Sequence, residues 1–329
     1  MAVLDRRTRI ADRTPVGDDA TPDRRASVNG VDLGATLSWY RHGRNDPTTW
    51  IDRVGKGPQA AGRFVRATWT PDGPATVHLR WSSGAAVDAD AWGPGAAWLL
   101  ARVPLMIGES DQGDATLEFD AHPVVAAAAR ANRFVRFGAS GTLYHELLPV
   151  ILQQRITALE AKHQWTVLCR ELGEEAPGPF AGLVVPPAPD VLRRQPSWWF
   201  HPLGVERKRA QPLIEVARHA SKFWDWAQLE ATEAARLLRL IPGVGVWTTG
   251  CVTGPAMGDV DAVPVGDFHV KNIIGWNLAD EARATDERML ELLAPYTGRR
   301  GRVVRAVTAH GRGAPKFGPK QRIVSMSRW

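Results

Sequence analysis

The spacing of the apolar residues changes once along the chain, near residue 121, and this change constrains the fold more than any other feature. Before it, two β-rich runs, Arg63–Trp69 and Ala75–Trp81, alternate in places between apolar and polar residues and are separated by a Pro-Asp-Gly turn, which predicts a hairpin. After it, apolar residues recur at helical intervals within 158–172, 213–220, 234–241 and 289–296. We therefore expect an α+β protein with a small β-rich unit ahead of a mainly helical one.

Pattern and composition together divide the chain into four expected parts. Residues 1–30 mix both charge signs with almost no large apolar side chains, so they are not expected to fold alone. The four parts are a flexible leader at 1–30, an N-terminal α+β domain at 31–120, a helical domain at 121–310 and a basic tail at 311–329.

Smaller elements complete the predicted domains. Ala96–Val103 has a helix-like pattern and Ala115–Phe119 reads as a further strand. In the helical part, Gly173 is a natural C-cap and Thr285 an N-cap. The Pro-rich connector at 173–190 is expected to wrap over the helical domain.

Cysteine content and hydropathy exclude several classes of protein. Cys169 and Cys251 are the only cysteines, too few for a disulfide framework, a structural zinc site or a cysteine-ligated iron–sulfur cluster. They fit a reducing, cytoplasmic setting. No apolar run reaches the roughly 18–20 residues of a membrane span, so no membrane contact is expected.

The chain is basic, with a net charge of +6, and 34 of its 41 basic residues are Arg. The planar guanidinium fork suits phosphate. The excess alone does not distinguish a nucleic-acid partner from a compositional bias.

The most informative stretch is the run at 240–249, Leu-Ile-Pro-Gly-Val-Gly-Val-Trp-Thr-Thr. One helix is expected to end at Ile241 and the next to begin near Val246, with Gly243 and Gly245 in the turn. Glycines allow close approach of a ligand to the backbone, and the second helix presents unpaired N–H groups, so the corner can bind an anion. The alternative is a helix corner with glycines for packing only. A Walker loop is excluded because the Lys-Ser/Thr ending is absent.

A second motif, Asp-Ala-Val-Pro-Val-Gly-Asp-Phe-His-Val-Lys-Asn at 261–272, follows the first by about twenty residues. In type, order and spacing, the two motifs resemble the helix-hairpin-helix (HhH-GPD) DNA glycosylase superfamily. Within it, the chain is most similar to the 3-methyladenine DNA glycosylase II family. The resemblance covers roughly residues 35–310 and includes His42-Gly43, Asp46-Pro47-Thr48 and Lys208-Arg209-Ala210.

That resemblance implies a helical glycosylase core of two subdomains around a cleft, and a monofunctional enzyme of base excision repair. Such an enzyme turns a damaged base out of the duplex and hydrolyses its N-glycosidic bond, leaving an abasic site. The implied substrates are alkylated purines of the 3-methyladenine and 7-methylguanine type. The implied partner is double-stranded DNA carrying damaged bases, bound by a cytoplasmic, nucleoid-associated protein that is expected to be a monomer with no cofactor, metal or iron–sulfur cluster.

Asp267 is the candidate catalytic residue, because a carboxylate near the sugar can stabilise oxocarbenium character and position water. Its alternative role is an N-cap of the following helix, and both roles are compatible. Asp259 and Asp261 are weaker candidates. Trp247 stands where bifunctional relatives carry a lysine, so no lyase activity is expected.

The resemblance also assigns a base pocket and a DNA-contacting surface. The base pocket is expected to comprise Trp247, Cys251 and His269, with Trp247 stacking on an electron-poor base. Residues 303–308, where relatives carry another pocket aromatic, contain none. Residues 152–158 resemble the helix that faces the minor groove. DNA contacts are expected at Gly243, Val244, Gly245, Val246, Gln154, Arg155 and Lys271, with Arg155 as the wedge and Arg302 near enough to assist.

Two other functional classes remain open from the sequence. One is a noncatalytic or narrowed-specificity damaged-DNA-binding protein of the same fold. The other is a soluble α+β enzyme with an anion-binding helix corner.

Overall fold

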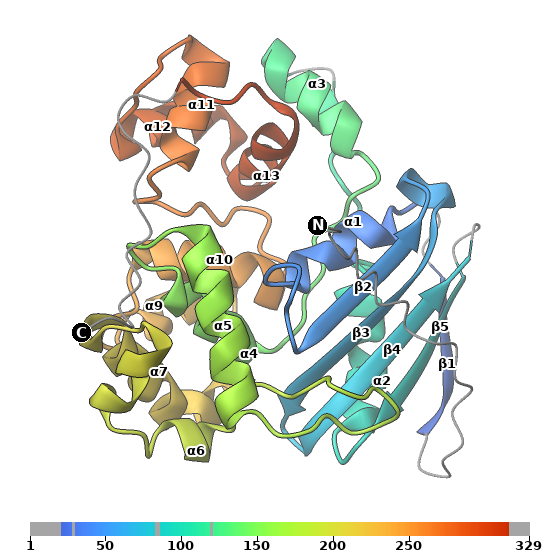
Figure 1. Cartoon of the computed structure of the whole chain (residues 1–329). Helices are drawn as coiled ribbons and strands as arrows, with labels where there is room; N and C mark the ends of the chain where they lie inside the picture. The colour runs from blue at the N-terminus through green and yellow to red at the C-terminus, as the bar shows by residue number, and fades with distance from the viewer. Residues whose placement is uncertain (1–20, 28–29, 83–85, 119–120, 316–329) are drawn as a thin grey trace, which may run out of the picture.

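The computed structural model describes residues 21–27, 30–82, 86–118 and 121–315, and it contains one antiparallel sheet beside a larger helical part (Figure 1). The sheet has the order β1-β5-β4-β3-β2. Its strands are β1 (Thr21–Ser27), β2 (Thr49–Val54), β3 (Ala61–Thr70), β4 (Gly73–Trp81) and β5 (Ala86–Trp92). The predicted hairpin is confirmed as β3 and β4, which pair from Thr70 with Gly73 to Gly62 with Trp81.

Helices make up most of the remaining described chain, as the expected α+β class requires. The α-helices are α1 (Leu33–Leu37), α2 (Ala96–Met106), α3 (Pro123–Asn132), α4 (Leu143–Leu152), α5 (Ala158–Leu172), α6 (Pro189–Leu192), α7 (Arg207–His219), α8 (Phe223–Trp226), α9 (Ala231–Leu238), α10 (Val246–Met257), α11 (Val270–Ala279), α12 (Asp286–Leu293) and α13 (Arg300–His310). The 3-10 helices are η1 (Ser38–Tyr40), η2 (Gly57–Gln59), η3 (Ala115–Glu118), η4 (Ser197–Leu203), η5 (Ala220–Lys222) and η6 (Ala294–Tyr296).

Two segments of the N-terminal region differ from the sequence-based expectation. The segment expected to be a leader contains β1, which pairs with β5; residues 1–20 lie outside the described residues. The expected strand at 115–119 is the 3-10 helix η3 instead, and Phe119 lies outside the described residues. The cause is local, because Asp114 Oδ1 accepts hydrogen bonds from both the amide and the hydroxyl of Thr116 and turns the backbone.

The sheet packs on different partners on its two faces. Helices α1 and α2 bury an apolar cluster against one face, with Leu79, Val87 and Leu99 at its centre. On the other side, the connector at 173–190 packs Leu183 and Val185 against Val65. Figure 1 shows this connector running from the helical part to the sheet. The expectation that it wraps over the helical domain therefore holds only in part: Leu183 and Val185 pack against the sheet, while Val184 packs against the helical core and Pro187 O accepts a hydrogen bond from Tyr144.

The helical part has two apolar cores. The larger core is centred on α4, all ten residues of which are buried, and includes side chains of α5, α7 and α10. A second core joins α3 to α11, α12 and α13, and Figure 1 shows these helices as a separate group above α4, α5 and α10. The two groups correspond to the two helical subdomains that the resemblance implies.

The predicted helix ends have the expected partners. Gly173 follows α5, and its N–H donates to Cys169 O. Thr285 Oγ1 accepts from Arg288 N at the start of α12. No helix in the described part of the chain is long and apolar enough to cross a membrane.

Candidate active site

The Pro-Gly-Val-Gly corner lies between α9 and α10. Helix α10 begins at Val246, as predicted, whereas α9 ends at Leu238 and not at the expected Ile241. Gly243 has φ = 86°, and a Cβ there would stand 2.2 Å from Pro212 Cγ, so this glycine is required for packing. Gly245 differs, because a Cβ there would meet no atom within 4 Å. No side chain caps the first turn of α10. The corner therefore contains one packing glycine and one open glycine beside uncapped helix N–H groups, which suit an anion.

The segment after α4 is a turn and not a helix. The expectation of a helix over 152–158 is wrong, because α4 ends at Leu152 and α5 begins at Ala158. Arg155 occupies the turn with φ = 60°, a conformation that is uncommon for residues other than glycine. Its side chain is exposed, in a position compatible with the predicted wedge.

Two polar side chains hold this turn against its surroundings. Gln154 Nε2 donates to Gly243 O at 3.0 Å and to Thr248 Oγ1 at 3.1 Å. Arg209 donates to Leu152 O at 3.1 Å. The turn after α4 and the Pro-Gly-Val-Gly corner are thus fixed relative to each other. Arg155, the predicted wedge, and the corner, the predicted phosphate-binding site, therefore form one surface.

The carboxylate of Asp267 is held by three N–H donors. Oδ1 accepts from the amides of His269, at 2.8 Å, and Val270, at 3.0 Å, at the start of α11. Oδ2 accepts from Trp247 Nε1 at 3.0 Å. Asp267 therefore binds the first amides of α11 and is itself half-buried, so the structure is compatible with both roles considered for it.

Three other predicted residues have partners within the protein. Lys271 Nζ lies 3.0 Å from Asp286 Oδ2, and Asp286 Oδ1 accepts from Gly266 N at 2.8 Å. Asp286 thus binds Gly266 and Lys271, on either side of Asp267, and restrains the loop that carries it. Asp261 is paired with Arg300, and Arg302 with Asp111. Asp261 is thus committed to a salt bridge, and neither Lys271 nor Arg302 is free of a carboxylate partner.

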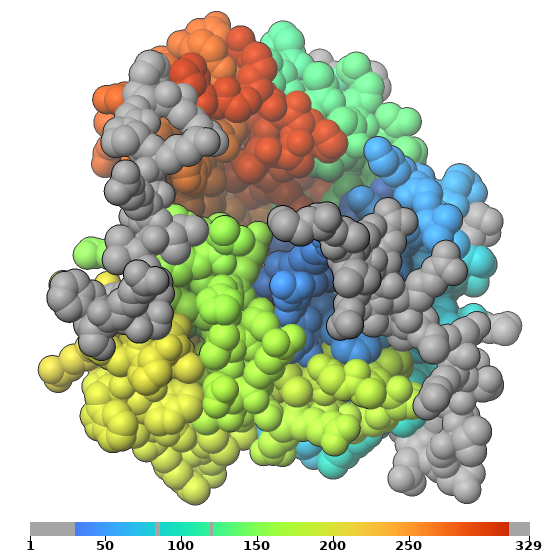
Figure 2. Space-filling view, viewed as in Figure 1, coloured from blue at the N-terminus to red at the C-terminus, as the bar shows by residue number. Residues whose placement is uncertain are grey.

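A cavity of about 420 Å³ lies where the two helical subdomains meet the N-terminal region. Pro264 and Val270, on either side of Asp267, are among its walls. Figure 2 shows the surface hollowed between the α13 segment and the α4–α5 segment. Its walls come from η1, α4, α10, α11 and α13 together with the loops near 42, 137 and 262.

Aromatic surface in this cavity comes from the N-terminal side of the chain. Trp39 and Phe137 line it, with ring centroids 4.8 Å apart in an edge-to-face arrangement. The guanidinium of Arg305 lies 4.0 Å from the centroid of Trp39, and burial lowers the pKa of Arg305 to about 10. Residues 303–308 contribute no aromatic, as predicted. Sequence reasoning missed Trp39 and Phe137, which stand far from both motifs; the only signal was that Trp39 precedes the His42-Gly43 match.

The three residues predicted for the base pocket are not gathered in one place. Cys251 lines the cavity, and burial, followed by the charge of Asp267, raises the pKa of its thiol. Trp247 packs against the larger helical core and uses its indole N–H on Asp267. His269 is exposed and contacts Phe268 edge to face. Neither Trp247 nor His269 is among the cavity walls.

Comparison with solved structures identifies the fold. A 3-methyladenine DNA glycosylase from Archaeoglobus fulgidus superposes with a TM-score of 0.67 at 17% identity, over 86% of this chain and 96% of that one. The apo 8-oxoguanine glycosylase/lyase from Clostridium acetobutylicum gives 0.58 at 13% identity, over 80% and 99%. MBOgg1, in complex with a low affinity DNA ligand, gives 0.58 at 16% identity, over 80% and 98%.

No protein-family model and no curated protein sequence matches the chain. The structural likeness therefore defines a class: the chain has the helix-hairpin-helix DNA glycosylase fold.

Proposed function

We propose that the protein is a monofunctional DNA glycosylase that removes alkylated purines, of the 3-methyladenine or 7-methylguanine type, from double-stranded DNA. The observation that carries this proposal is the placement of Asp267: its carboxylate is held by three N–H donors, in the loop between Pro264 and Val270, two walls of a cavity of about 420 Å³. A cavity of that size is within the range of small-molecule sites and can take one purine turned out of the stack.

The proposed mechanism assigns each part of the site a task. The backbone around Gly245 and the first turn of α10 bind a DNA phosphate, and Arg155 fills the gap that the displaced base leaves. The base enters the cavity beside Trp39 and Phe137, whose aromatic surface can pack against it. Asp267 faces the sugar, stabilises the positive charge that develops as the N-glycosidic bond breaks, and positions the attacking water.

Water is the proposed nucleophile because no lysine stands at the position in the corner where bifunctional relatives carry one. A Schiff base forms on a lysine amine, and the corresponding position is Trp247. The indole N–H instead holds Asp267 Oδ2. The product is then an abasic site in an intact strand.

Release of bases from methylated duplex DNA tests this function. We expect the wild-type protein to release 3-methyladenine or 7-methylguanine and to leave strands that break only after alkali treatment. Asp280→Asn is the matched control for Asp267→Asn and should behave like wild type. Asp280 follows α11 with φ = 56°, a conformation that Asn tolerates. Among the described residues, its side chain forms an exposed salt bridge with Arg312. No released base from the wild type would contradict the proposal. Strand breakage without alkali would contradict the monofunctional mechanism.

A noncatalytic damage-binding role predicts a different result in the same assay. Such a protein would bind duplexes that contain an abasic analogue and would release no base at any enzyme concentration. Asp267→Asn would then equal the wild type in every readout.

A further inference from the structure

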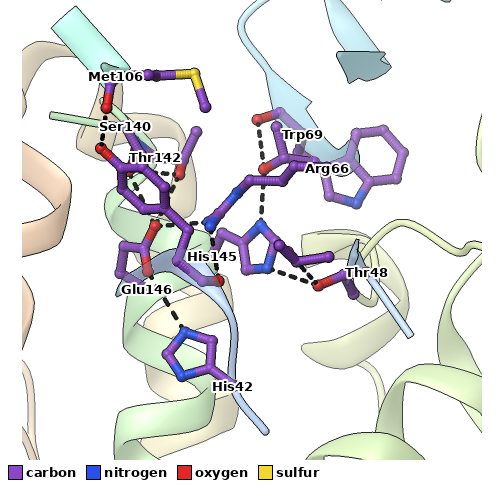
Figure 3. Close-up of polar contacts among 12 residues, drawn as sticks. His42, Thr48, Arg66, Trp69, Met106, Ser140, Thr142, His145 and Glu146 are labelled. Atoms are coloured by element: carbon purple, nitrogen blue, oxygen red, sulfur yellow. Dashed lines mark hydrogen bonds and ion pairs between the residues drawn. The ribbon is translucent and has the colours of Figure 1, made fainter. Parts of the chain in front are cut away.

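A buried polar network connects the N-terminal sheet to α4 next to the cavity (Figure 3). Arg66 of β3 donates to Glu146 Oε1 at 2.6 Å, and Ser140 donates to the same oxygen at 3.0 Å. The Glu146 and Arg66 side chains are each 1% exposed. Burial raises the pKa of Glu146, but its interactions with Arg66 and His42 outweigh this and lower it overall. One carboxylate oxygen is thus fully engaged.

Among the described residues, one polar side chain lies beside the second oxygen of Glu146. His42 Nε2 lies 3.5 Å from Oε2, and Figure 3 shows the ring pointing toward this oxygen. Both atoms are sealed from solvent and, among the described residues, neither has a well-formed hydrogen bond. Both side chains are walls of the cavity. The mechanism proposed above uses neither of them.

The contact with Glu146 orients the His42 ring and selects its tautomer. A carboxylate oxygen is an acceptor only, so it favours a hydrogen on the nitrogen that faces it, which is Nε2. In the neutral ring the other nitrogen, Nδ1, then keeps its lone pair. The side chain is 13% exposed. Nε2 is sealed, whereas Nδ1 is not among the sealed polar atoms that have no partner. The cavity wall therefore offers a hydrogen-bond acceptor.

We infer that His42, oriented by Glu146, selects bases that present an amino group, accepting a hydrogen bond at Nδ1 from the exocyclic amine of the extrahelical base. The inference rests on the glycosylase function proposed above and narrows its substrates to amino-bearing purines over their oxo counterparts. An oxo group would place one lone pair against another. His42 is the specificity-determining residue that touches the base, and Glu146 is a positioning residue that acts through it.

Equilibrium dialysis with two free bases tests this inference without requiring turnover. 3-Methyladenine and 3-methylhypoxanthine differ in carrying an amine or an oxygen at one ring carbon. The wild-type protein should bind 3-methyladenine about tenfold more tightly, because an unmatched buried acceptor costs about that factor. His42→Phe keeps a ring without nitrogens, so the two affinities should differ by less than about twofold.

Glu146→Gln provides a readout that a purely structural role would not change. Arg66 and Ser140 both donate at the Oε1 position, so the amide oxygen must take that side and the amide NH₂ must face His42. Nε2 then becomes the acceptor and Nδ1 carries the hydrogen. The preference should invert toward 3-methylhypoxanthine. Thermal unfolding of each variant shows whether it is folded; if Glu146→Gln does not fold, His42→Phe decides the question.

The outcomes separate this inference from the glycosylase function. Equal binding of the two bases by the wild type, an unchanged amine preference in His42→Phe, or an unchanged preference in folded Glu146→Gln each overturns the role of His42, whether or not the protein excises bases from DNA. Amine-selective binding without any excision would leave this role standing and overturn the glycosylase proposal.

Discussion

Two carboxylates near one cavity are held in different ways: Glu146 is one of its walls, and Asp267 lies in the loop between two wall residues, Pro264 and Val270. Asp267 accepts three N–H hydrogen bonds from groups without a formal charge and remains half-buried. Glu146 is fully buried and paired with the guanidinium of Arg66. A carboxylate with uncharged donors and an open side is available to stabilise charge on a ligand, whereas one committed to a buried cation holds structural elements together. The difference separates the proposed chemical group from the proposed positioning group.

The largest expected effect comes from removing the buried cation that pairs with Glu146. Arg66→Met should lower the free energy of unfolding by about 3–5 kcal/mol, because it leaves a buried carboxylate unpaired. Urea denaturation measures the change. Arg63→Met is the matched control on the same strand: its exposed pair with Asp52 should contribute less than about 1 kcal/mol. Equal losses in the two variants would contradict the assignment of Glu146 to the core.

The Pro-Gly-Val-Gly corner shows a similar contrast, between one glycine that is required for packing and one that faces open space. Gly243→Ala should lower the free energy of unfolding by about 2 kcal/mol or more, since it adds strain at positive φ and a clash with Pro212. Gly245→Ala should cost less than about 1 kcal/mol and weaken duplex binding several-fold, because its methyl group would occupy the open space at the predicted phosphate-binding site. Unchanged binding in Gly245→Ala would favour a corner used for packing only.

A smaller effect is expected from removing one of the three hydrogen bonds to the Asp267 carboxylate. Trp247→Phe keeps an aromatic ring but removes the N–H that holds Oδ2. We expect excision to slow about tenfold, corresponding to one hydrogen bond of about 1–1.5 kcal/mol, with duplex affinity unchanged. Trp198→Phe, at a tryptophan that is 72% exposed, is the control. If Trp247→Phe weakens binding and leaves the excision rate constant intact, Trp247 contacts DNA and does not position Asp267.

Local features of the site could be predicted from the sequence. The Pro-Gly-Val-Gly corner and the loop that carries Asp267 are each formed by neighbouring residues, and backbone geometry specifies them directly. The β3–β4 hairpin was predictable for the same reason. The predicted site residues themselves stay predictions, because their functions require DNA.

Features that depend on contacts between distant segments could not be predicted. Arg66 and Glu146 are 80 residues apart, and no local pattern connects them. Trp39 and Phe137 become cavity walls only when η1 and the segment before α4 pack beside α13. The connector at 173–190 is expected from its sequence to cover the helical domain, because its apolar residues do not indicate which surface of the protein they pack against. The strand β1 depends on pairing with β5, which its own composition does not reveal.

The single-turnover rate constant for base excision by Asp267→Asn decides whether Asp267 is the catalytic carboxylate. It is measured on a duplex with one alkylated purine at saturating enzyme, beside the dissociation constant for the same duplex. We expect a fall of at least about 100-fold in the rate constant, with an affinity within about twofold of wild type, because the substitution leaves the Pro-Gly-Val-Gly corner unchanged. A rate constant within a few-fold of wild type would contradict the assignment of Asp267 as the catalytic carboxylate.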